Sequence, residues 1–294
     1  MERRTDLALE ARELAGDEVQ GVDFSRRKDA GMEISKLKVK TRSASMELKK
    51  DIGTYITIEL PALTDNFLAT DDRVSVIGRE IRRLLPVNGL VLVCGLGNSD
   101  ITPDALGVKS ASGILATRHI TGELARSTGL DALRPVAVLS AGVTGKTGIE
   151  TFEHIESIVK KVRPTAVICI DALASRRISR LGCTVQLSDS GISPGSGVRN
   201  HRKKISLETV GVPVIAVGVP TVVDAVTMVL DLLDVEDEKT SADLKNALSP
   251  DNRSLVVTPK EIDLLIDRAS RLISLSLNYA LQENVDISLI EALI

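Results

Sequence analysis

The fold is decided by the stretch Val91-Leu-Val-Cys-Gly-Leu-Gly-Asn-Ser-Asp-Ile-Thr-Pro-Asp-Ala-Leu-Gly107. The apolar, β-branched run 90–94 predicts a buried parallel strand. Gly95 and Gly97 allow a tight turn after it and bring bare backbone close to a bound ligand. Thr102-Pro-Asp104 then predicts the start of a helix. Asp104 is therefore expected at the carboxyl edge of an open sheet, where such folds bind their ligands.

Two other interpretations of this stretch remain open at this point. Gly95-Leu-Gly97 could begin a dinucleotide-binding fingerprint, but position 100 is Asp where the third glycine is required. Asp104 could act only as a first-turn acid that complements the helix dipole, which stabilises by about 0.3–1 kcal/mol. A catalytic role for Asp104 therefore depends on a second functional group nearby.

Length and composition indicate an α/β protein. The chain has 294 residues, of which 43% are hydrophobic and 2% aromatic, so Val, Ile, Leu and Ala must form most of the core. The formal net charge of −3 argues against a general nucleic-acid binder. No apolar run is long enough to span a bilayer, and the first residues do not form a secretion signal. We expect no direct nucleic-acid partner and no membrane partner.

A strand–helix rhythm follows the opening stretch and predicts a three-layer α/β fold, with a mostly parallel open sheet and helices on both faces. Strands are expected at 90–94, 136–140, 166–170, 183–187 and 214–218. Helices are expected at 71–85, 103–119, 149–161 and 221–233. Apolar–polar alternation in 34–40 and 54–60 predicts a small N-terminal antiparallel β addition, preceded by a helix at 6–14.

We expect these elements to form a single domain, 1–294. It divides into an N-terminal extension with a β-hairpin (1–65), a βαβ core (66–233), a connector (234–256) and C-terminal helices (257–294). The connector is acid-rich at 234–243, which is typical of a solvated segment. Thr258-Pro-Lys-Glu261 predicts the cap of a helix that ends at about 274, and a further helix follows.

The pair Asp104 and Asp171 is the strongest candidate for chemistry. Asp171 stands at the end of the expected strand 166–170, and the carboxyl ends of parallel strands meet at one edge of a sheet. Two carboxylates in one cleft can divide the roles of acid and base and activate water. The structural alternative for Asp171 is to cap a short helix at 173–180. An ion held by both aspartates and a third ligand also remains open.

Other patterns give weaker indications. Gly142-Val-Thr-Gly-Lys-Thr-Gly148 has the wrong spacing for a phosphate-binding loop and predicts a glycine turn at the same sheet edge. The polar loop 188–204 ends in a cluster of cations that could attract an acidic substrate, or it could be a solvated loop. The three cysteines lack C-x-x-C spacing and are expected as reduced core residues. The three histidines are scattered, and no H-E-x-x-H zinc motif occurs.

Glycine turns and polar loops beside the aspartates can supply backbone donors and hydroxyls to a bound peptide or oxyanion. The substrate-binding candidates in these loops are Gly97, Asn98, Gly145, Ser190, Gly191 and Gly195.

Several motifs, in order, closely resemble the germination protease family of spore-forming bacteria. They are Arg4-Thr-Asp-Leu-Ala8, Gly95-Leu-Gly-Asn98, Thr102-Pro-Asp-Ala-Leu-Gly107, Gly145-Lys-Thr-Gly-Ile-Glu-Thr151, Ile170-Asp-Ala-Leu-Ala-Ser175, Ser188-Asp-Ser-Gly-Ile-Ser-Pro-Gly-Ser-Gly197, Pro220-Thr-Val-Val-Asp-Ala225 and Val257-Thr-Pro-Lys-Glu261. The likeness covers nearly the whole chain.

The resemblance implies an endopeptidase that initiates degradation of small acid-soluble spore proteins during germination, in the cytoplasm of the spore core. It implies a fold similar to hydrogenase-maturation proteases, a homotetramer, and catalytic aspartates at Asp104 and Asp171. It leaves the mechanism as either atypical aspartic or metal-assisted, and we expect no cofactor. The alternatives are a hydrogenase-maturation-like processing peptidase and a non-catalytic protein that binds a nucleotide or peptide.

Two departures from the family pattern are visible. The resemblance implies a zymogen activated by removal of a short N-terminal propeptide, but only residues 1–3 precede Arg4, so we expect no such control. The segment before Val257 also looks shorter than usual, which predicts a trimmed surface excursion.

Overall fold

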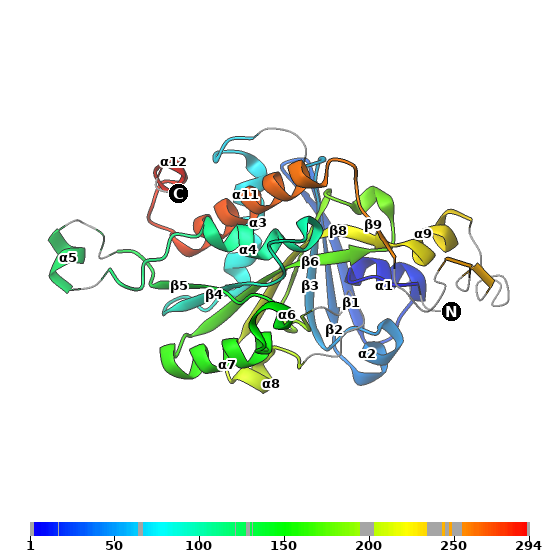
Figure 1. The fold of residues 1–294 in the computed structure, drawn as a ribbon, viewed down its shortest axis with the longest axis horizontal. Coiled ribbons are helices and arrows are strands. Elements are labelled where there is room, and N and C mark those ends of the chain that lie inside the picture. The colour runs from blue at the N-terminus through cyan, green and yellow to red at the C-terminus, as the bar shows by residue number, and fades with distance from the viewer. Residues whose placement is uncertain are drawn as a thin grey trace.

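The computed structural model describes residues 3–16, 18–63, 67–120, 122–127, 130, 132–194, 203–233, 243–244, 247–248 and 255–292. Its strands form one open sheet in the order β1-β2-β3-β7-β8-β6-β4-β5, with β9 paired to β8, and helices lie on both faces (Figure 1). The expected three-layer α/β fold class is therefore confirmed.

The parallel part of the sheet consists of four strands, with β4 and β6 at its centre. They are β5 (Val136–Ser140), β4 (Val91–Gly95), β6 (Ala166–Ser175) and β8 (Val214–Asp224). The antiparallel part is formed by β1 (Val22–Asp29), β2 (Met32–Val39), β3 (Gly53–Glu59), β7 (Thr184–Ser188) and β9 (Val256–Val257). The N-terminal β addition thus continues the main sheet, because β3 pairs with β7.

Three clusters of buried side chains separate the layers. One face of the sheet is covered by α3 (Asp72–Leu84), α4 (Leu106–Ser112) and α11 (Ile262–Leu281). The other face is covered by α1 (Ala8–Ala15), α2 (Arg42–Leu48), α7 (Thr151–Val162) and α8 (Leu207–Val210). β4 contributes Val91 and Val93 to the first face and Leu92 and Cys94 to the second. Burial on both faces explains its uninterrupted apolar sequence.

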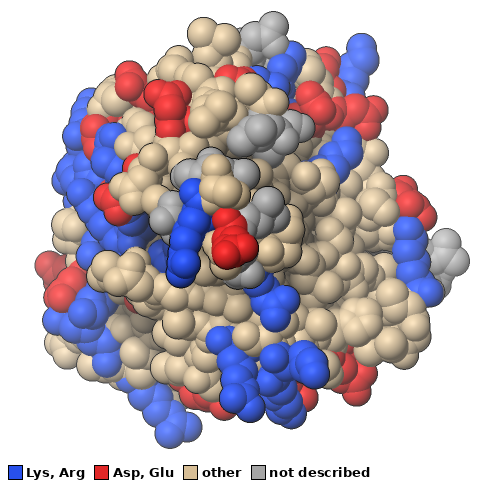
Figure 2. All heavy atoms as spheres, turned by 90° about the vertical axis from the view of Figure 1, so that its left-hand side faces the viewer, with Lys and Arg blue, Asp and Glu red and all other residues tan. Residues whose placement is uncertain are grey.

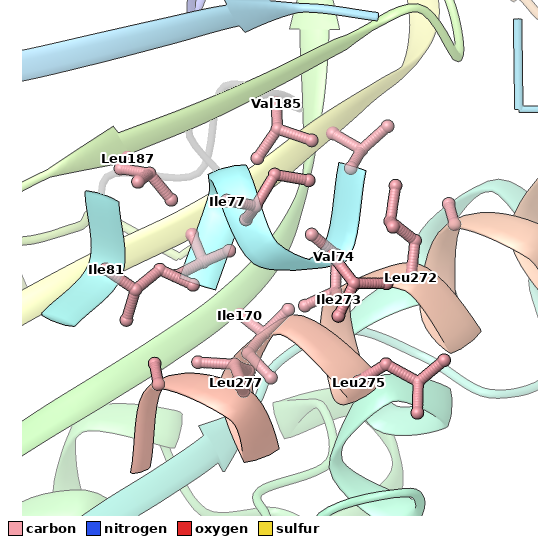
Figure 3. Close-up of a cluster of buried hydrophobic side chains, with 14 of the residues drawn as sticks. Val74, Ile77, Ile81, Ile170, Val185, Leu187, Leu272, Ile273, Leu275 and Leu277 are labelled. Atoms are coloured by element: carbon pink, nitrogen blue, oxygen red, sulfur yellow. The ribbon is translucent and has the colours of Figure 1, made fainter. Parts of the chain in front are cut away.

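The core between α3, α11 and the sheet is built from aliphatic side chains (Figure 3). Ile77 and Ile81 recur at helical spacing on α3 and are fully buried. They lie in the same cluster as Ile273 and Leu277 of α11. Each such side chain contributes about 1.5–3 kcal/mol on burial, so this contact fixes α3 and α11 against the sheet.

The remaining short elements are α5 (Gly122–Ser127), α6 (Thr144–Thr147), α9 (Ala225–Leu232), α12 (Ile287–Glu291) and the 3-10 turns η1 (Thr102–Asp104) and η2 (Ile178–Arg180). Several elements were not expected from the sequence, among them β1 and α2. β1 is the exposed edge strand with few apolar residues, so it lacks an amphipathic pattern. α2 is a short helix capped by Thr41, whose side chain accepts a hydrogen bond from the Ala44 amide.

The helix expected at 103–119 is wrong in its length. The chain forms η1, then α4 from Leu106 to Ser112, and the helix ends at Gly113. Asn278 of α11 accounts for this end, because its side chain accepts from the Leu115 amide at 2.9 Å and donates to the Gly113 carbonyl at 2.9 Å. A tertiary contact replaces the helical hydrogen bonds at this point.

The strand ends expected at 170 and 218 are also wrong. β6 and β8 remain paired beyond Asp171, as far as Ser175 and Val223, with one register shift between Leu173 and Ala174. No helix begins at 173 or 221, so Asp171 caps no helix. The following helix, α9, begins at Ala225 after the cap residue Asp224.

The C-terminal region differs in one respect from the sequence prediction. The expected helix from the Thr258 cap starts at Ile262 and continues beyond 274 to Leu281 as α11, and the further helix is α12. The acid-rich residues 234–242 lie outside the described part of the chain, so the prediction of a solvated connector stays a prediction. No helix among the described residues is long and apolar enough to cross a membrane.

Charged side chains of both signs occupy the face at the left-hand end of Figure 1. Figure 2 shows Lys and Arg gathered along one side and the bottom of this face, with Asp and Glu among them. The formal net charge of −3 is therefore not expressed as an acidic surface on this face.

Candidate active site

A cavity of about 540 Å³ lies at the carboxyl end of the parallel strands, and both Asp104 and Asp171 line it. Its walls come from segments far apart in the sequence. They are the N-terminal residues 5–6, the loop 49–51 after α2, the turn 96–104, the continuation of β6, and the loop after β7. The two aspartates that the sequence singled out therefore open into one cavity.

Asp104 is held by the glycine turn that precedes it. Its carboxylate oxygen Oδ2 accepts a 2.8 Å hydrogen bond from the backbone amide of Asn98. Gly97 adopts φ +101°, and a Cβ there would lie 2.0 Å from the carbonyl oxygen of Asp104. Glycine is required at 97 both for this backbone conformation and for the close approach. The turn thus explains the position of the half-buried Asp104 side chain.

Asp171 lies inside β6, between a buried apolar run and the cavity. It is 8% exposed. Its Oδ1 accepts a 3.0 Å hydrogen bond from the Ala172 amide. Asp171 pairs in register with Gly218 of β8, where an added Cβ would meet the Leu173 side chain at 2.6 Å. The small residue at 218 leaves room for that side chain beside Asp171.

Three close contacts fix the two aspartates relative to each other. The Leu96 amide donates to the Ile170 carbonyl at 2.9 Å, which joins the Asp104 turn to the residue before Asp171. A Cβ at Gly107 would lie 2.2 Å from the same carbonyl, so α4 packs directly on β6. Thr221 Oγ1 of β8 donates to the Pro103 carbonyl at 2.8 Å. Both carboxylates therefore project from one rigid frame.

The predicted substrate-binding residues divide into three groups. Gly97, Ser190 and Gly191 line the cavity. Asn98 and Gly145 are not among its lining residues, and the Asn98 amide is used by Asp104. Gly195 lies outside the described residues.

The glycine turn 142–148 forms the short helix α6, where Gly145 is exposed. Lys146 of α6 forms an ion pair with Asp100, in the loop before Asp104. The hydrogen bond from Lys146 and the positive charge of Lys146 lower the pKa of Asp100. Segment 142–148 therefore contacts the loop that leads to Asp104. This is the sheet edge at which we expected the glycine turn.

Among the further polar side chains that line the cavity and were not singled out from the sequence are Lys50, Tyr55 and Gln186. The Tyr55 hydroxyl donates to the Asp51 carbonyl at 2.9 Å, and burial raises the pKa of Tyr55 to about 12. The only sequence signal for this wall was the pattern Lys-Lys-Asp before a strand, which is common on protein surfaces. Tertiary contacts alone place these residues at the site.

The cysteines follow their expected role in packing. Cys94 and Cys169 are free, buried and paired in register on β4 and β6, and Cys183 is free and half-buried. A hydrogen bond with Cys94, together with burial, raises the pKa of Cys169. Because a thiolate is the reactive form, Cys169 has no character of a nucleophile.

No group of three or more His, Cys, Asp or Glu side chains in the described ranges is arranged to hold a metal ion. The two aspartates have no third ligand of these types beside them within those ranges. The donor set that the described residues offer therefore does not fit a metal centre with three protein ligands of these types.

Comparisons with known proteins identify relatives of this chain. A family model described as germination protease matches residues 3–236. The germination protease of Caldanaerobacter subterraneus subsp. tengcongensis is 45% identical, with 95% of this chain and 94% of that protein covered. That of Clostridium perfringens is 38% identical, with 96% of each chain covered. That of Priestia megaterium is 34% identical, with 96% of this chain and 94% of that protein covered.

Among solved structures, a nickel–iron hydrogenase maturation protease from Thermococcus kodakarensis aligns with 68% of this chain and 98% of its own. The TM-score is 0.38 and the identity 18%, so this overlap carries no argument about the site. The sequence comparisons are decisive, since the family model and the relatives extend over most of the chain. This protein belongs to the germination protease family.

Proposed function

We propose that this protease is an endopeptidase that initiates degradation of small acid-soluble spore proteins during germination, by means of water activated between Asp104 and Asp171. Membership of the germination protease family supports the activity. The observation that supports the mechanism is that both carboxylates line one cavity of about 540 Å³.

In this mechanism one carboxylate is ionised and the other protonated when the substrate binds. The ionised group takes a proton from water as the water oxygen attacks the peptide carbonyl carbon, and the protonated group donates to the carbonyl oxygen. The tetrahedral intermediate then collapses and the C–N bond breaks: the leaving amine takes a proton from the acid formed in the first step, and the carboxylate formed in that step takes the proton of one hydroxyl group of the intermediate as the new carbonyl forms. The mechanism requires both groups to reach one scissile bond, and the backbone contacts that join the two aspartates support this requirement.

The cavity has the mixed lining that an extended peptide requires. Apolar side chains such as Leu96, Ile101 and Val222 form part of it, and Ser188 and Ser190 add hydroxyl groups. Apolar walls can take substrate side chains, and the hydroxyl groups can bind the substrate backbone.

The proposal includes a homotetramer that acts in the cytoplasm of the spore core, without a cofactor and without direct contact to nucleic acid or membrane. The resemblance to the family supports the tetramer and the location, and the net charge of −3 and the short apolar runs support the two points about nucleic acid and membrane.

Digestion of a purified small acid-soluble spore protein by the full-length chain tests the proposal. Discrete internal cuts are expected for the wild type, and turnover should fall by orders of magnitude in Asp104→Asn and Asp171→Asn, which nearly keep shape. Asp100→Asn is the matched control, because Asp100 is an exposed carboxylate of the same loop. Normal cutting by either site variant would contradict the mechanism.

The same digestion separates the alternative functions. One terminal cut would indicate a processing peptidase, and binding without cleavage would indicate a non-catalytic protein. Assay after exhaustive chelation should leave activity intact, and activity restored only by a stoichiometric ion would make the aspartates metal ligands.

A further inference from the structure

We propose that Lys50 is a positioning residue for this reaction, which fixes Thr5 and Asp6 as a wall of the cavity beside the strand that carries Asp171. The inference takes the identity of the reaction from the proposed function. Nothing in the sequence pattern pointed to Lys50, which lies between α2 and β3. Its role follows from the contacts of its ammonium group.

The ammonium group of Lys50 binds two consecutive backbone carbonyls. Nζ donates to the Thr5 oxygen at 3.0 Å and to the Asp6 oxygen at 2.9 Å. Hydrogen bonds from a charged donor are stronger than neutral ones, so a single side chain can hold this segment of backbone. Thr5, Asp6 and Lys50 all line the cavity. The contact is therefore part of the cavity wall.

Asp6 connects this contact to the strand of Asp171. Its amide donates to the Ala174 carbonyl at 2.8 Å, and its Oδ2 accepts from the Ala174 amide at 2.7 Å. Gln186 Nε2 of β7 donates to the Asp6 carbonyl at 3.0 Å, so this oxygen serves both Gln186 and Lys50. Ala174 is three residues beyond Asp171 on β6. The wall thus supports the continuation of the strand on which Asp171 lies.

A second set of contacts, to the backbone that follows β6, also holds α1. The Glu10 side chain is fully buried and accepts from the Arg176 amide at 2.6 Å and the Arg177 amide at 3.1 Å. Loss of the Lys50 contacts should therefore release the residues that face the cavity, while α1 stays docked. This separation makes a folded Lys50 variant an expected outcome.

The charges that face Lys50 come from three directions: Asp6 in the N-terminal segment, Glu10 in α1 and Asp51 beside it. Lys49 and Tyr55 also line the cavity at this wall. Burial lowers the pKa of Lys50, and the three carboxylates act in the opposite direction without cancelling this effect. The positive charge on Lys50 is therefore lost at a lower pH than in an exposed lysine.

The first test compares full-length Lys50→Met with Lys38→Met, which removes an exposed lysine of β2 outside the cavity lining. Lys50→Met should raise KM for a small acid-soluble spore protein by about tenfold and leave kcat within about twofold, because the wall binds substrate and takes no part in proton transfer. Hydrogen exchange should accelerate in the segments 4–7 and 172–176. Lys38→Met should show neither change.

The second test uses Lys50→Arg and does not depend on the folding of Lys50→Met. Arginine keeps its charge at every accessible pH. KM of the wild type should therefore rise at alkaline pH as Lys50 loses its proton, whereas KM of Lys50→Arg should rise less. An alkaline rise that is identical in both proteins would overturn the inference.

A folded Lys50→Met protein with unchanged KM and unchanged hydrogen exchange would also overturn the inference about Lys50. These outcomes are distinct from failure of the proposed function. Full activity of Asp104→Asn or Asp171→Asn would remove the aspartate mechanism, whereas the exchange measurement would still report whether Lys50 holds the wall.

Discussion

The Leu96 amide donates a 2.9 Å hydrogen bond to the Ile170 carbonyl. Leu96 stands in the turn that leads to Asp104, and Ile170 directly precedes Asp171. This bond extends the parallel pairing of β4 and β6 by one step beyond the last strand pair, Gly95 and Ile170. The two carboxylates are therefore joined through backbone, so that movement of the turn before Asp104 also displaces the strand residues next to Asp171.

This connection predicts that the two aspartates act as one unit. The double variant Asp104→Asn/Asp171→Asn should lose little more kcat/KM than either single variant, because each single change already removes one half of a coupled acid and base. Single-turnover kinetics on all three proteins measures this. If the loss of kcat/KM in the double variant equals the product of the two single losses, the residues act independently.

Gly97 is predicted to be intolerant of a side chain. Gly97→Ala must accommodate a Cβ at 2.0 Å from the Asp104 carbonyl oxygen at a φ of +101°. A strained backbone of this kind costs about 1–3 kcal/mol, and displacement of Asp104 should lower kcat in addition. Urea unfolding and steady-state assay measure the two effects separately.

The matched control is Gly145→Ala, where an added Cβ meets nothing within 4 Å and the residue lies in α6. Alanine at a helical position should be stabilising by about 0.5–1 kcal/mol. Equal behaviour of the two variants would contradict the close approach at Gly97.

The parts of the site that the sequence could predict are encoded locally. The run before Gly95 is apolar because β4 is buried on both faces, and Gly97 is fixed by its backbone conformation. Both features leave a local mark in the sequence, an uninterrupted apolar run and a glycine. This is why the strand and the location of Asp104 and Asp171 at one sheet edge could be deduced without coordinates.

The parts that could not be predicted depend on distant partners. β6 continues past Asp171 because it stays paired with β8 and because Asp6, 168 residues away, bonds to Ala174. α4 stops early because Asn278 takes over the hydrogen bonds at its end. Lys50 belongs to the site only through such contacts. No local pattern contains this information.

Tyr55 is predicted to make the protein sensitive to alkali. Its folded pKa of about 12 exceeds the usual unfolded value of about 10, so its contribution to stability is complete below the unfolded value and is lost as pH rises through the folded value. At about 1.4 kcal/mol per pKa unit, roughly 2–3 kcal/mol should be lost across this window.

Tyr55→Phe should flatten this alkaline decline. At neutral pH it should be less stable than the wild type by about 1 kcal/mol, because the Asp51 carbonyl loses its donor. Urea unfolding of both proteins from pH 8 to about 11 provides the comparison. Parallel curves for the two proteins would show that Tyr55 does not titrate in this range.

Glu13 is predicted to contribute to sensitivity toward acid. Burial acts to raise the pKa of Glu13, but the hydrogen bond and charge of Arg180, with the charges of Arg177 and Arg176, outweigh it and lower the pKa. The lowered folded value means that Glu13 stabilises the protein above its unfolded pKa of about 4.3, and that this contribution is lost as pH falls through the folded value.

Glu13→Gln should therefore reduce stability at pH 7 by roughly 1–3 kcal/mol, since Arg180 Nη2 loses a charged acceptor at 2.6 Å. The difference from the wild type should shrink as the pH falls below the unfolded pKa and through the lowered folded pKa of Glu13. Unfolding midpoints from pH 7 to pH 3 measure this convergence. Glu47→Gln, which changes an exposed glutamate of α2, should run parallel to the wild type throughout. A constant difference between Glu13→Gln and the wild type at every pH would mean that the Arg180 contact stabilises through packing and not through charge.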